Sequence, residues 1–280
     1  MQTKFVWSSI TVLLFIVTIL FATAIKGKSV LKTKTFTKME NKEKMKIKIW
    51  SDIMCPFCYI GKRNIEQALS NFPEKQNIEI EWKSFQLDPS IPEIPKYQDD
   101  IYRFVAQTKG ISYEQSKSMH EHVVKMAEQS GLEYHFDKIL VTNSLKSHIL
   151  IQLAKTKGLA SEAEEKLFYS YFTLGKNLND INQLTVIGEE IGIKKDEIEK
   201  AFNNDDFVLK VKKDRQEALA YGMTGVPLLV INGKHVIVGA QQPEEILKTI
   251  SKAYQEWKSE QDPNLKIQYG ASCDSDGSCQ

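Results

Sequence analysis

The chain has 280 residues, which is long enough for one large domain with a hydrophobic core, or for a domain that carries an insertion. Its 37 lysines and arginines against 36 aspartates and glutamates give a formal net charge of +1, which argues against a polyanionic partner such as nucleic acid. With four cysteines, two of them three positions apart, the chain resembles a redox or metal protein more than a small disulfide-stapled scaffold.

The first residues form an apolar segment of their own. Residues Phe5–Ile25 carry no charge and are long enough to cross a bilayer as a helix, which predicts membrane association. A signal peptide cleaved after Ala24 would instead mean export, because small residues precede that position as at a cleavage site. A start at Met39 or Met45 would mean a cytoplasmic protein, since the folded pattern begins at Met45. We assign residues 1–44 to this segment and a polar tether.

The folded region opens with a strand, a helix and a second strand. Residues Met45–Trp50 alternate between apolar and polar side chains, as in a half-buried strand. A helix follows from Cys55, because proline is favoured at the first helical position and Pro56 comes next. Residues Ile78–Phe85 alternate again as a second strand. This order predicts a right-handed parallel unit, to which we assign residues 45–95.

A long helical stretch follows the second strand. Helix caps, glycine stops and apolar periodicity predict several helices in succession. One of them is expected to open on a capping box formed by Ser161 and Glu164. The other clear candidates cover Tyr113–Gln129, Asn143–Lys157, Gln183–Ile191 and Lys195–Asn203. Such a run predicts an all-helical insertion, residues 96–204, in place of a continued doubly wound sheet.

The last folded part returns to the sheet. Its predicted elements are a helix over Asp206–Tyr221, strands over Leu228–Ile231 and His235–Val238, and a helix from Pro243 to about Trp257. The Asn232-Gly233 pair between the two strands is a strong hairpin signal. Residues 205–260 therefore form the second part of the same fold, and the polar residues 261–280 predict a flexible tail.

The clustered cysteines lie where the first strand meets the first helix. A thiol attacks a disulfide as the thiolate, and free backbone N–H groups at a helix N-terminus favour that charged form. This makes Cys55 the predicted nucleophile and Cys58, one turn deeper, the thiol that resolves the mixed disulfide. Pro56 fixes the turn between them and Phe57 adds no charge, so we assign both to the substrate-binding surface. This chemistry needs no metal and no organic cofactor.

Two structural uses of the cysteine pair compete with this interpretation. A structural zinc site would need two further soft ligands at short spacing. The other two cysteines, Cys273 and Cys279, lie far along the chain in the tail. A purely structural disulfide across so small a loop would restrict the unfolded chain little. A zinc-stabilised binding module is the non-enzymatic alternative.

Four separate patterns resemble one family. They are WSDIMCPFCYIGKR, FQLDPSIP, TNSLKSH and GVPLLVINGKHVIVGAQQP, and together they extend from about Met45 to Lys258. They are similar to the DsbA-like branch of the thioredoxin superfamily, and most closely to its FrnE-type members. The resemblance implies an α/β thioredoxin fold interrupted by an all-helical subdomain, here preceded by the N-terminal hydrophobic helix.

The resemblance also implies roles for individual residues. In thioredoxin-like folds the proline at the position of Pro227 is cis and packs against the redox pair, and the residue matching Val226 binds the substrate backbone. His148 matches a histidine position of these relatives and is expected either to face the substrate groove or to be a hydrogen-bonded helix histidine. Asp52 and Tyr59 flank the cysteines, and one of them is expected to relay protons to the buried thiol.

The tail cysteines form a second candidate pair. Cys273 and Cys279 are expected to form a mobile disulfide that exchanges with Cys55, as a secondary redox pair. Asp274 and Asp276 oppose thiolate formation there, so an incidental oxidisable pair or an adventitious metal clip is the alternative.

The predicted activity is thiol-disulfide exchange through a mixed disulfide at Cys55, with Cys58 as the resolving thiol. The expected partners are protein thiols and disulfides or small thiols of the glutathione type, and a membrane if Phe5–Ile25 is retained. A rival enzyme is a glutathione-linked isomerase of the hydroxychromene carboxylate type, which resembles this architecture but typically uses serine in place of the redox pair. The presence of both cysteines argues against that rival.

Overall fold

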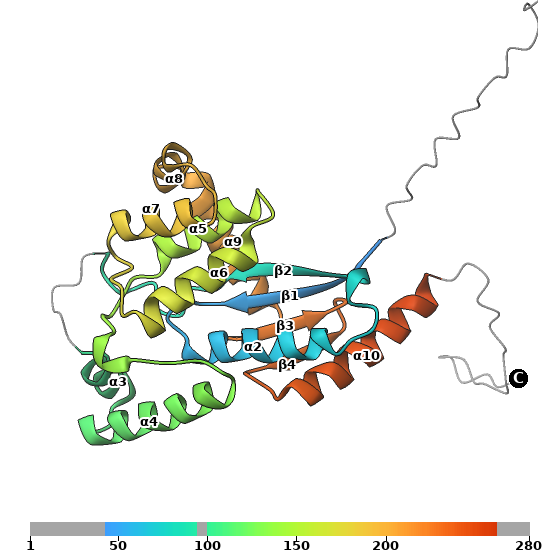
Figure 1. The fold of residues 1–280 in the computed structure, drawn as a ribbon, viewed down its shortest axis with the longest axis horizontal. Coiled ribbons are helices and arrows are strands. Elements are labelled where there is room, and N and C mark those ends of the chain that lie inside the picture. Colours follow the sequence, from blue (N-terminus) through green and yellow to red (C-terminus); the bar gives the residue numbers. More distant parts are fainter. Residues whose placement is uncertain (1–42, 94–99, 262–280) are drawn as a thin grey trace, which may run out of the picture. The chain divides into compact units, whose positions relative to one another are not determined.

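The computed structural model describes residues 43–93 and 100–261, which are built around one mixed β-sheet (Figure 1). Its strands are β1 (Met45–Ser51), β2 (Ile78–Ser84), β3 (Leu228–Ile231) and β4 (His235–Val238). They lie in the order β2-β1-β3-β4, with β1 parallel to β2 and antiparallel to β3, and with β3 antiparallel to β4. The sheet therefore joins two segments that are far apart in the sequence, as the predicted order requires.

Helices cover both faces of the sheet, because its strands alternate buried residues between the two faces. On one face, Ile47, Ile49 and Leu229 pack under α2 (Pro56–Ser70) and α10 (Pro243–Glu260). On the other face, Trp50 packs with Ala218 of α9 (Asp205–Ala220). The Trp50 indole N–H also donates to the backbone oxygen of Asp214, at 2.7 Å, which fastens α9 to the sheet.

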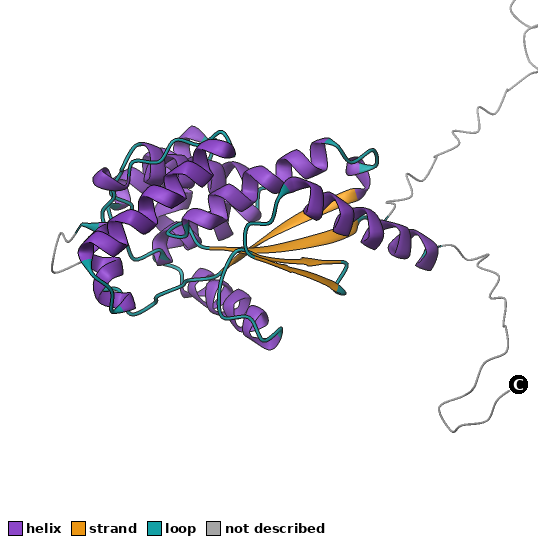
Figure 2. Cartoon of the chain, turned by 90° about the horizontal axis from the view of Figure 1, so that it is seen from below, coloured by secondary structure: helices purple, strands orange, loops and turns teal. Residues whose placement is uncertain are grey.

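The chain between β2 and α9 is helical in the residues that the structure describes. Its helices are α3 (Ile101–Lys109), α4 (Tyr113–Gln129), α5 (Leu145–Lys155), α6 (Ala160–Phe168), α7 (Ile181–Glu190) and α8 (Lys195–Phe202). Short turns of other helix types link the β-strands and these helices: η1 (Lys75–Asn77), η2 (Phe136–Lys138) and η3 (Tyr169–Thr173). Figure 2 shows this helical part gathered at one end of the sheet.

Most element boundaries agree with the sequence patterns within a few residues, and one local prediction is wrong. Helix α6 begins at Ala160, and no capping box involving Ser161 and Glu164 forms. Glu164 is instead 1% exposed, and its Oε2 accepts a hydrogen bond from the hydroxyl of Ser51 at 3.2 Å. The polar spacing imitates a cap, but this carboxyl group points into the interior because α6 packs against the end of β1.

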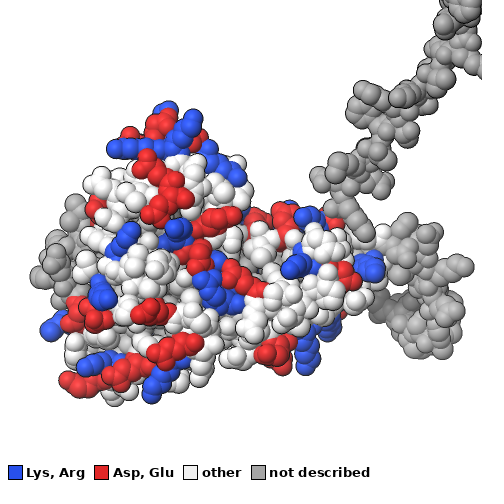
Figure 3. Space-filling model, viewed as in Figure 1, with Lys and Arg blue, Asp and Glu red and all other residues white. Residues whose placement is uncertain are grey.

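The surface carries charges of both signs. On the face drawn in Figure 3, lysines and arginines alternate with aspartates and glutamates across the described part of the chain. Several of them pair across elements, such as Lys157 with Glu197 at 2.6 Å and Lys166 with Glu190 at 3.0 Å. This face therefore presents no extended surface of a single sign.

Several sequence predictions concern residues outside those that the structure describes. The apolar segment Phe5–Ile25 and the tail pair Cys273 and Cys279 lie outside the described residues, so their proposed roles stay predictions. Within residues 43–93 and 100–261, no helix combines the length and the apolar character needed to cross a bilayer.

Candidate active site around the cysteine pair

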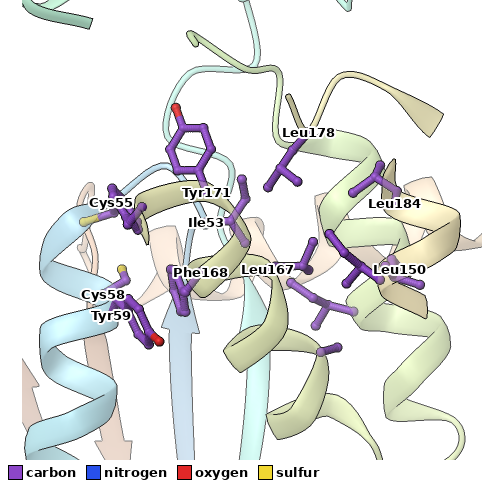
Figure 4. Packing of buried hydrophobic residues seen from close by; sticks show 14 of the residues in the cluster. Ile53, Cys55, Cys58, Tyr59, Leu150, Leu167, Phe168, Tyr171, Leu178 and Leu184 are labelled. Carbon is purple, nitrogen blue, oxygen red and sulfur yellow. The ribbon is translucent and has the colours of Figure 1, made fainter. Parts of the chain in front are cut away.

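The cysteine pair occupies the first turn of α2, where the sequence predicts it (Figure 4). Cys55 is the N-cap residue, Pro56 is the first helical residue, and the backbone N–H of Cys58 donates to the Cys55 oxygen at 3.0 Å. Both thiols are free and nearly buried, with Cys55 5% and Cys58 2% exposed. Among the residues that the structure describes, no side chain caps this helix end, so the N–H groups of its first turn and the positive end of its dipole are directed at Cys55.

The segment before β3 packs against this turn from the other side. The peptide bond between Val226 and Pro227 is cis, as the family resemblance implies. The Cys55 thiol lies 3.5 Å from the backbone oxygen of Val226, to which it can donate a hydrogen bond. A Cβ atom at Gly61 would lie 3.2 Å from the Pro227 ring, so glycine there permits the close approach of α2 to this loop. Sequence reasoning thus places Cys55, Val226 and Pro227 together correctly, while their roles toward substrate stay predictions.

The second thiol faces the protein interior. Burial raises the pKa of the Cys58 thiol well above its ordinary value, and the neighbouring Cys55 raises it further, while a hydrogen bond to the Asp52 backbone opposes the shift. Asp52 is fully buried, and its oxygens accept hydrogen bonds from the backbone N–H groups of Leu87, at 2.7 Å, and Met54, at 3.3 Å. The Cys58 thiol is therefore held in its protonated form by its buried surroundings.

His148 lies behind Asp52 and does not face a groove. Its side chain is 0% exposed on α5, and Nε2 lies 3.4 Å from Oδ1 of Asp52. Neither ring nitrogen has a hydrogen-bond partner among the described residues, so His148 is not the hydrogen-bonded helix histidine of the alternative expectation either. The prediction that His148 contacts substrate is wrong, because α5 turns this face of the helix into the core.

Glu164 completes this buried polar group and was missed by sequence reasoning. Burial raises the pKa of Glu164 to about 7, against the opposing effects of His148 and the Ser51 hydroxyl. Its Oε1 atom has no hydrogen-bond partner among the described residues. No local pattern could have identified it, because its position depends on how α6 packs against β1 and α5. We call Asp52, His148 and Glu164 the buried triad.

Tyr59 is directed away from the thiols. Its hydroxyl donates to Glu165 at 2.7 Å, and its ring stacks on Phe168 with the ring centroids 5.0 Å apart. Burial raises the pKa of Tyr59 and the Glu165 carboxylate raises it further, so the phenol stays protonated at neutral pH. Of the two residues expected to relay protons, the geometry favours Asp52. Phe168 itself is fully buried in the core.

An apolar groove opens beside Cys55, and sequence reasoning expected a substrate groove but did not identify most of its walls. The cavity has a volume of about 410 Å³ and lies between the start of α2 and the helices α3 and α4. Of the predicted substrate-binding residues, Pro56 and Phe57 both line it, and Phe57 is 38% exposed. Its other apolar walls include Met54, Ile101, Phe104, Val105 and Met119. We call this cavity the Cys55 groove.

The residues that line the Cys55 groove could not be predicted as a group, because they come from separate segments of the chain. Met119 is 45% exposed on α4. In the sequence it lies at helical spacing from Val123 and Met126, a pattern that indicates an apolar helix face without showing what that face lines. No group of three or more histidine, cysteine, aspartate or glutamate side chains that could hold a metal occurs in the described part of the chain.

Comparison with known proteins identifies a family and a relative. Residues 46–251 match the model of the DSBA-like thioredoxin domain. The uncharacterized protein YwbO of Bacillus subtilis (strain 168) is 29% identical over 217 residues, which cover 73% of this chain and 95% of YwbO. The match therefore includes both parts of the sheet and the helices between them.

Solved structures agree with this family. A probable DsbA oxidoreductase of Streptomyces coelicolor is 27% identical and superposes with a TM-score of 0.72, covering 84% of this chain and 98% of its own. A 2-hydroxychromene-2-carboxylate isomerase superposes with a TM-score of 0.58 at 12% identity, covering 78% of this chain and all of its own. At that identity the isomerase shows only that the fold is shared.

Proposed function

The chain belongs to the DSBA-like thioredoxin domain family, and from this premise we propose that it is a thiol-disulfide oxidoreductase of the FrnE type. The observation that carries the proposal is the pair of free thiols on the first turn of α2, one beside an open groove and one buried toward the interior. The likeness to the Streptomyces oxidoreductase supports the same activity class.

In the first step the thiolate of Cys55 attacks a substrate disulfide. One sulfur–sulfur bond forms between Cys55 and the substrate, the substrate disulfide breaks, and one substrate thiolate leaves and takes up a proton. The N-terminus of α2 favours the attacking thiolate, because backbone N–H groups and the helix dipole stabilise negative charge there. Val226, whose backbone oxygen already faces the Cys55 sulfur, would hold the substrate chain alongside.

In the second step Cys58 resolves the mixed disulfide. Its thiol gives up a proton and attacks the Cys55 sulfur, which forms the disulfide between the two cysteines and releases the second substrate thiolate. Two electrons pass from the cysteine pair to the substrate disulfide, and the reverse sequence oxidises a substrate dithiol. Because burial raises the pKa of Cys58, we propose that Asp52 accepts this proton.

Two alternatives make different demands on the cysteine pair. A glutathione-linked isomerase would turn over without net oxidation of thiols and would not need Cys58, whereas disulfide exchange needs both thiols. A zinc-stabilised binding module would lose its fold in a chelator. Metal analysis and a chelator melt of the purified chain therefore separate the binding module from the enzyme.

The direct test is trapping of the mixed disulfide. Cys58→Ser should accumulate a stable adduct with a disulfide substrate, because the resolving thiol is absent, whereas Cys55→Ser should form none and should lose insulin reduction. Mass spectrometry under non-reducing conditions measures the adduct. The variant pair is matched, since each replaces one sulfur atom by oxygen at the first turn of the same helix. Full insulin reduction by Cys55→Ser would overturn the proposal.

A further inference from the structure

A cluster of charged side chains joins α2 to α6 one turn beyond the cysteine pair. Glu165 of α6 accepts hydrogen bonds from Lys62 of α2, at 2.8 Å, and from Arg63 of α2 through both of its carboxylate oxygens. Glu66, one turn further along α2, pairs with the same two cations. We call Lys62, Arg63, Glu66 and Glu165 the α2 charge cluster. It contains two cations and two carboxylates, so its formal charges cancel.

The central carboxylate of the cluster is ionised at neutral pH. Burial opposes the charged form of Glu165, but hydrogen bonds from Arg63 and Lys62 outweigh burial and lower the pKa of Glu165 to about 2. Burial also disfavours the Arg63 cation, yet the hydrogen bonds to Glu165 raise the pKa of Arg63 above its ordinary value. The Lys62 side chain is only 3% exposed, so water screens its charge poorly. Glu165 is therefore the counter-charge of two cations at a weakly screened position.

The cluster lies close to the cysteine pair. Cys58 and Lys62 are four residues apart on α2, so they lie on the same face of the helix, about 6 Å apart along its axis. Cys55 lies one turn further, at about 10 Å along the axis from Lys62. Burial raises the pKa of Tyr134, both cysteines raise it further, and Arg63 lowers it. The thiols and a cation of the cluster thus act on one and the same buried phenol.

Buried aromatic rings accompany α2 between the thiols and the cluster. Tyr59 follows Cys58 in the sequence, and its hydroxyl donates to Glu165, so its ring extends from the second thiol's turn to the cluster (Figure 4). The Tyr59 ring centroid lies 5.0 Å from that of Phe168 and 6.2 Å from that of Tyr134. An apolar medium of this kind screens charge much less than water does. An uncancelled charge in the cluster would therefore be felt at the thiols.

A charge at this distance affects the two redox forms unequally. The reduced pair carries the Cys55 thiolate, whereas the oxidised pair is a neutral disulfide. Resting on the proposed exchange at Cys55, we propose that Glu165 is a positioning residue that holds Lys62 and Arg63 and cancels their charge, and thereby makes the cysteine pair less oxidising. Without Glu165 the cluster has a net charge of +1, which stabilises the thiolate and raises the reduction potential.

The test measures the equilibrium of the full-length chain with glutathione buffers at low ionic strength. The reduced pair and one oxidised glutathione give the disulfide between Cys55 and Cys58 and two reduced glutathiones, so two electrons pass to glutathione. Glu165→Gln should lower the equilibrium constant of this oxidation by about 3- to 5-fold, equivalent to a potential about 14 to 20 mV higher. Acid quenching, alkylation and mass spectrometry measure the fraction of chains in each form.

Two further variants separate charge from structure. Glu165→Asp keeps the charge on a shorter side chain, so its equilibrium constant should stay within about 2-fold of that of the natural chain. Arg63→Gln gives the cluster a net charge of −1 and should raise the constant by about 3- to 5-fold, opposite in sign to Glu165→Gln. Loss of the contact between α2 and α6 is common to both substitutions, so a purely structural effect gives no reason for opposite signs.

The control removes the same charge elsewhere. Glu197 pairs with Lys157 at 2.6 Å on α8, which lies well away from α2 in Figure 1, and Glu197→Gln should leave the constant unchanged. Shifts of the same sign in Glu165→Gln and Arg63→Gln, or a shift in neither, would overturn the inference. If Glu165→Gln does not fold, Arg63→Gln decides alone, because Arg63 is 28% exposed and no shift there contradicts the inference. Failure of the natural chain to form its disulfide in any buffer would instead refute the proposed function.

Discussion

The two sulfur atoms of the cysteine pair lie one helical turn apart and face opposite surroundings. Cys55 borders the Cys55 groove, whose walls are apolar and partly open to solvent. Cys58 faces the interior, where Asp52, His148 and Glu164 are all buried, and where both ring nitrogens of His148 and one oxygen of Glu164 have no hydrogen-bond partner among the described residues. One helix start thus separates an apolar groove from a buried polar cluster.

This difference corresponds to the two halves of the exchange reaction. The outer thiol must be ionised and must meet a substrate, which a helix N-terminus beside a groove provides. The inner thiol must stay protonated until the mixed disulfide forms, which burial provides by raising the Cys58 pKa. The buried triad contains Asp52, the residue that we propose as the acceptor of the proton that Cys58 releases.

The largest predicted effect tests how burial changes the ionisation of Glu164 in the buried triad. Glu164 has a pKa of about 7 in the folded chain against 4.5 in the unfolded chain. Its contribution to stability is therefore fully present below pH 4.5 and is lost as the pH rises through about 7, a change of about 3 kcal/mol. Glu164→Gln should remove this loss, so that the variant is more stable relative to the natural chain at pH 8 than at pH 5. Urea unfolding at the two pH values measures the difference.

The control for this prediction lies on the same helix. Glu162 is exposed on α6, and Glu162→Gln should leave the pH dependence of unfolding as it is. If Glu164→Gln and Glu162→Gln showed the same pH dependence, the buried position of Glu164 would have no electrostatic consequence.

The next effect tests Asp52 as the acceptor of the Cys58 proton. Asp52→Asn keeps the shape of the side chain and can still accept the Leu87 hydrogen bond, but it is a much weaker base. Release of product from a preformed mixed disulfide should slow by about 100-fold, equivalent to about 2.7 kcal/mol, and its pH profile should change. Stopped-flow measurement of both half-reactions is required, because initial attack by Cys55 should slow less than resolution. Equal slowing of both steps would indicate a structural role for Asp52 only.

The smallest effect tests the hydrogen bond that joins the helical insertion to the start of α2. The Tyr134 hydroxyl donates to the Pro56 oxygen at 2.8 Å, and the Tyr134 ring stacks against Phe172 with centroids 4.6 Å apart. Tyr134→Phe removes the hydrogen bond and keeps the stacking, and should lower the free energy of unfolding by about 1 kcal/mol. A thermal or urea melt measures this loss. An unchanged free energy of unfolding would mean that water replaces the Tyr134 hydroxyl at the Pro56 oxygen without cost.

Local sequence patterns predict the elements well, for identifiable reasons. The proline after Cys55 marks the start of α2, Asn232-Gly233 marks the turn between β3 and β4, and both predictions are confirmed. Each signal depends on the conformational preferences of one or two neighbouring residues. The predicted capping box at Ser161 failed because the same polar spacing also suits a carboxyl group that turns inward.

The sequence alone determined where the two thiols lie, which of them begins a helix and to which family the chain is similar, because these depend on adjacent residues and on extended patterns. Only the tertiary structure decided what surrounds each thiol. The Cys55 groove requires α3 and α4 to lie beside α2, and the buried triad requires α5 and α6 to close over the end of β1. Contacts between such distant segments follow from the packing of the whole chain, and no local spacing encodes them.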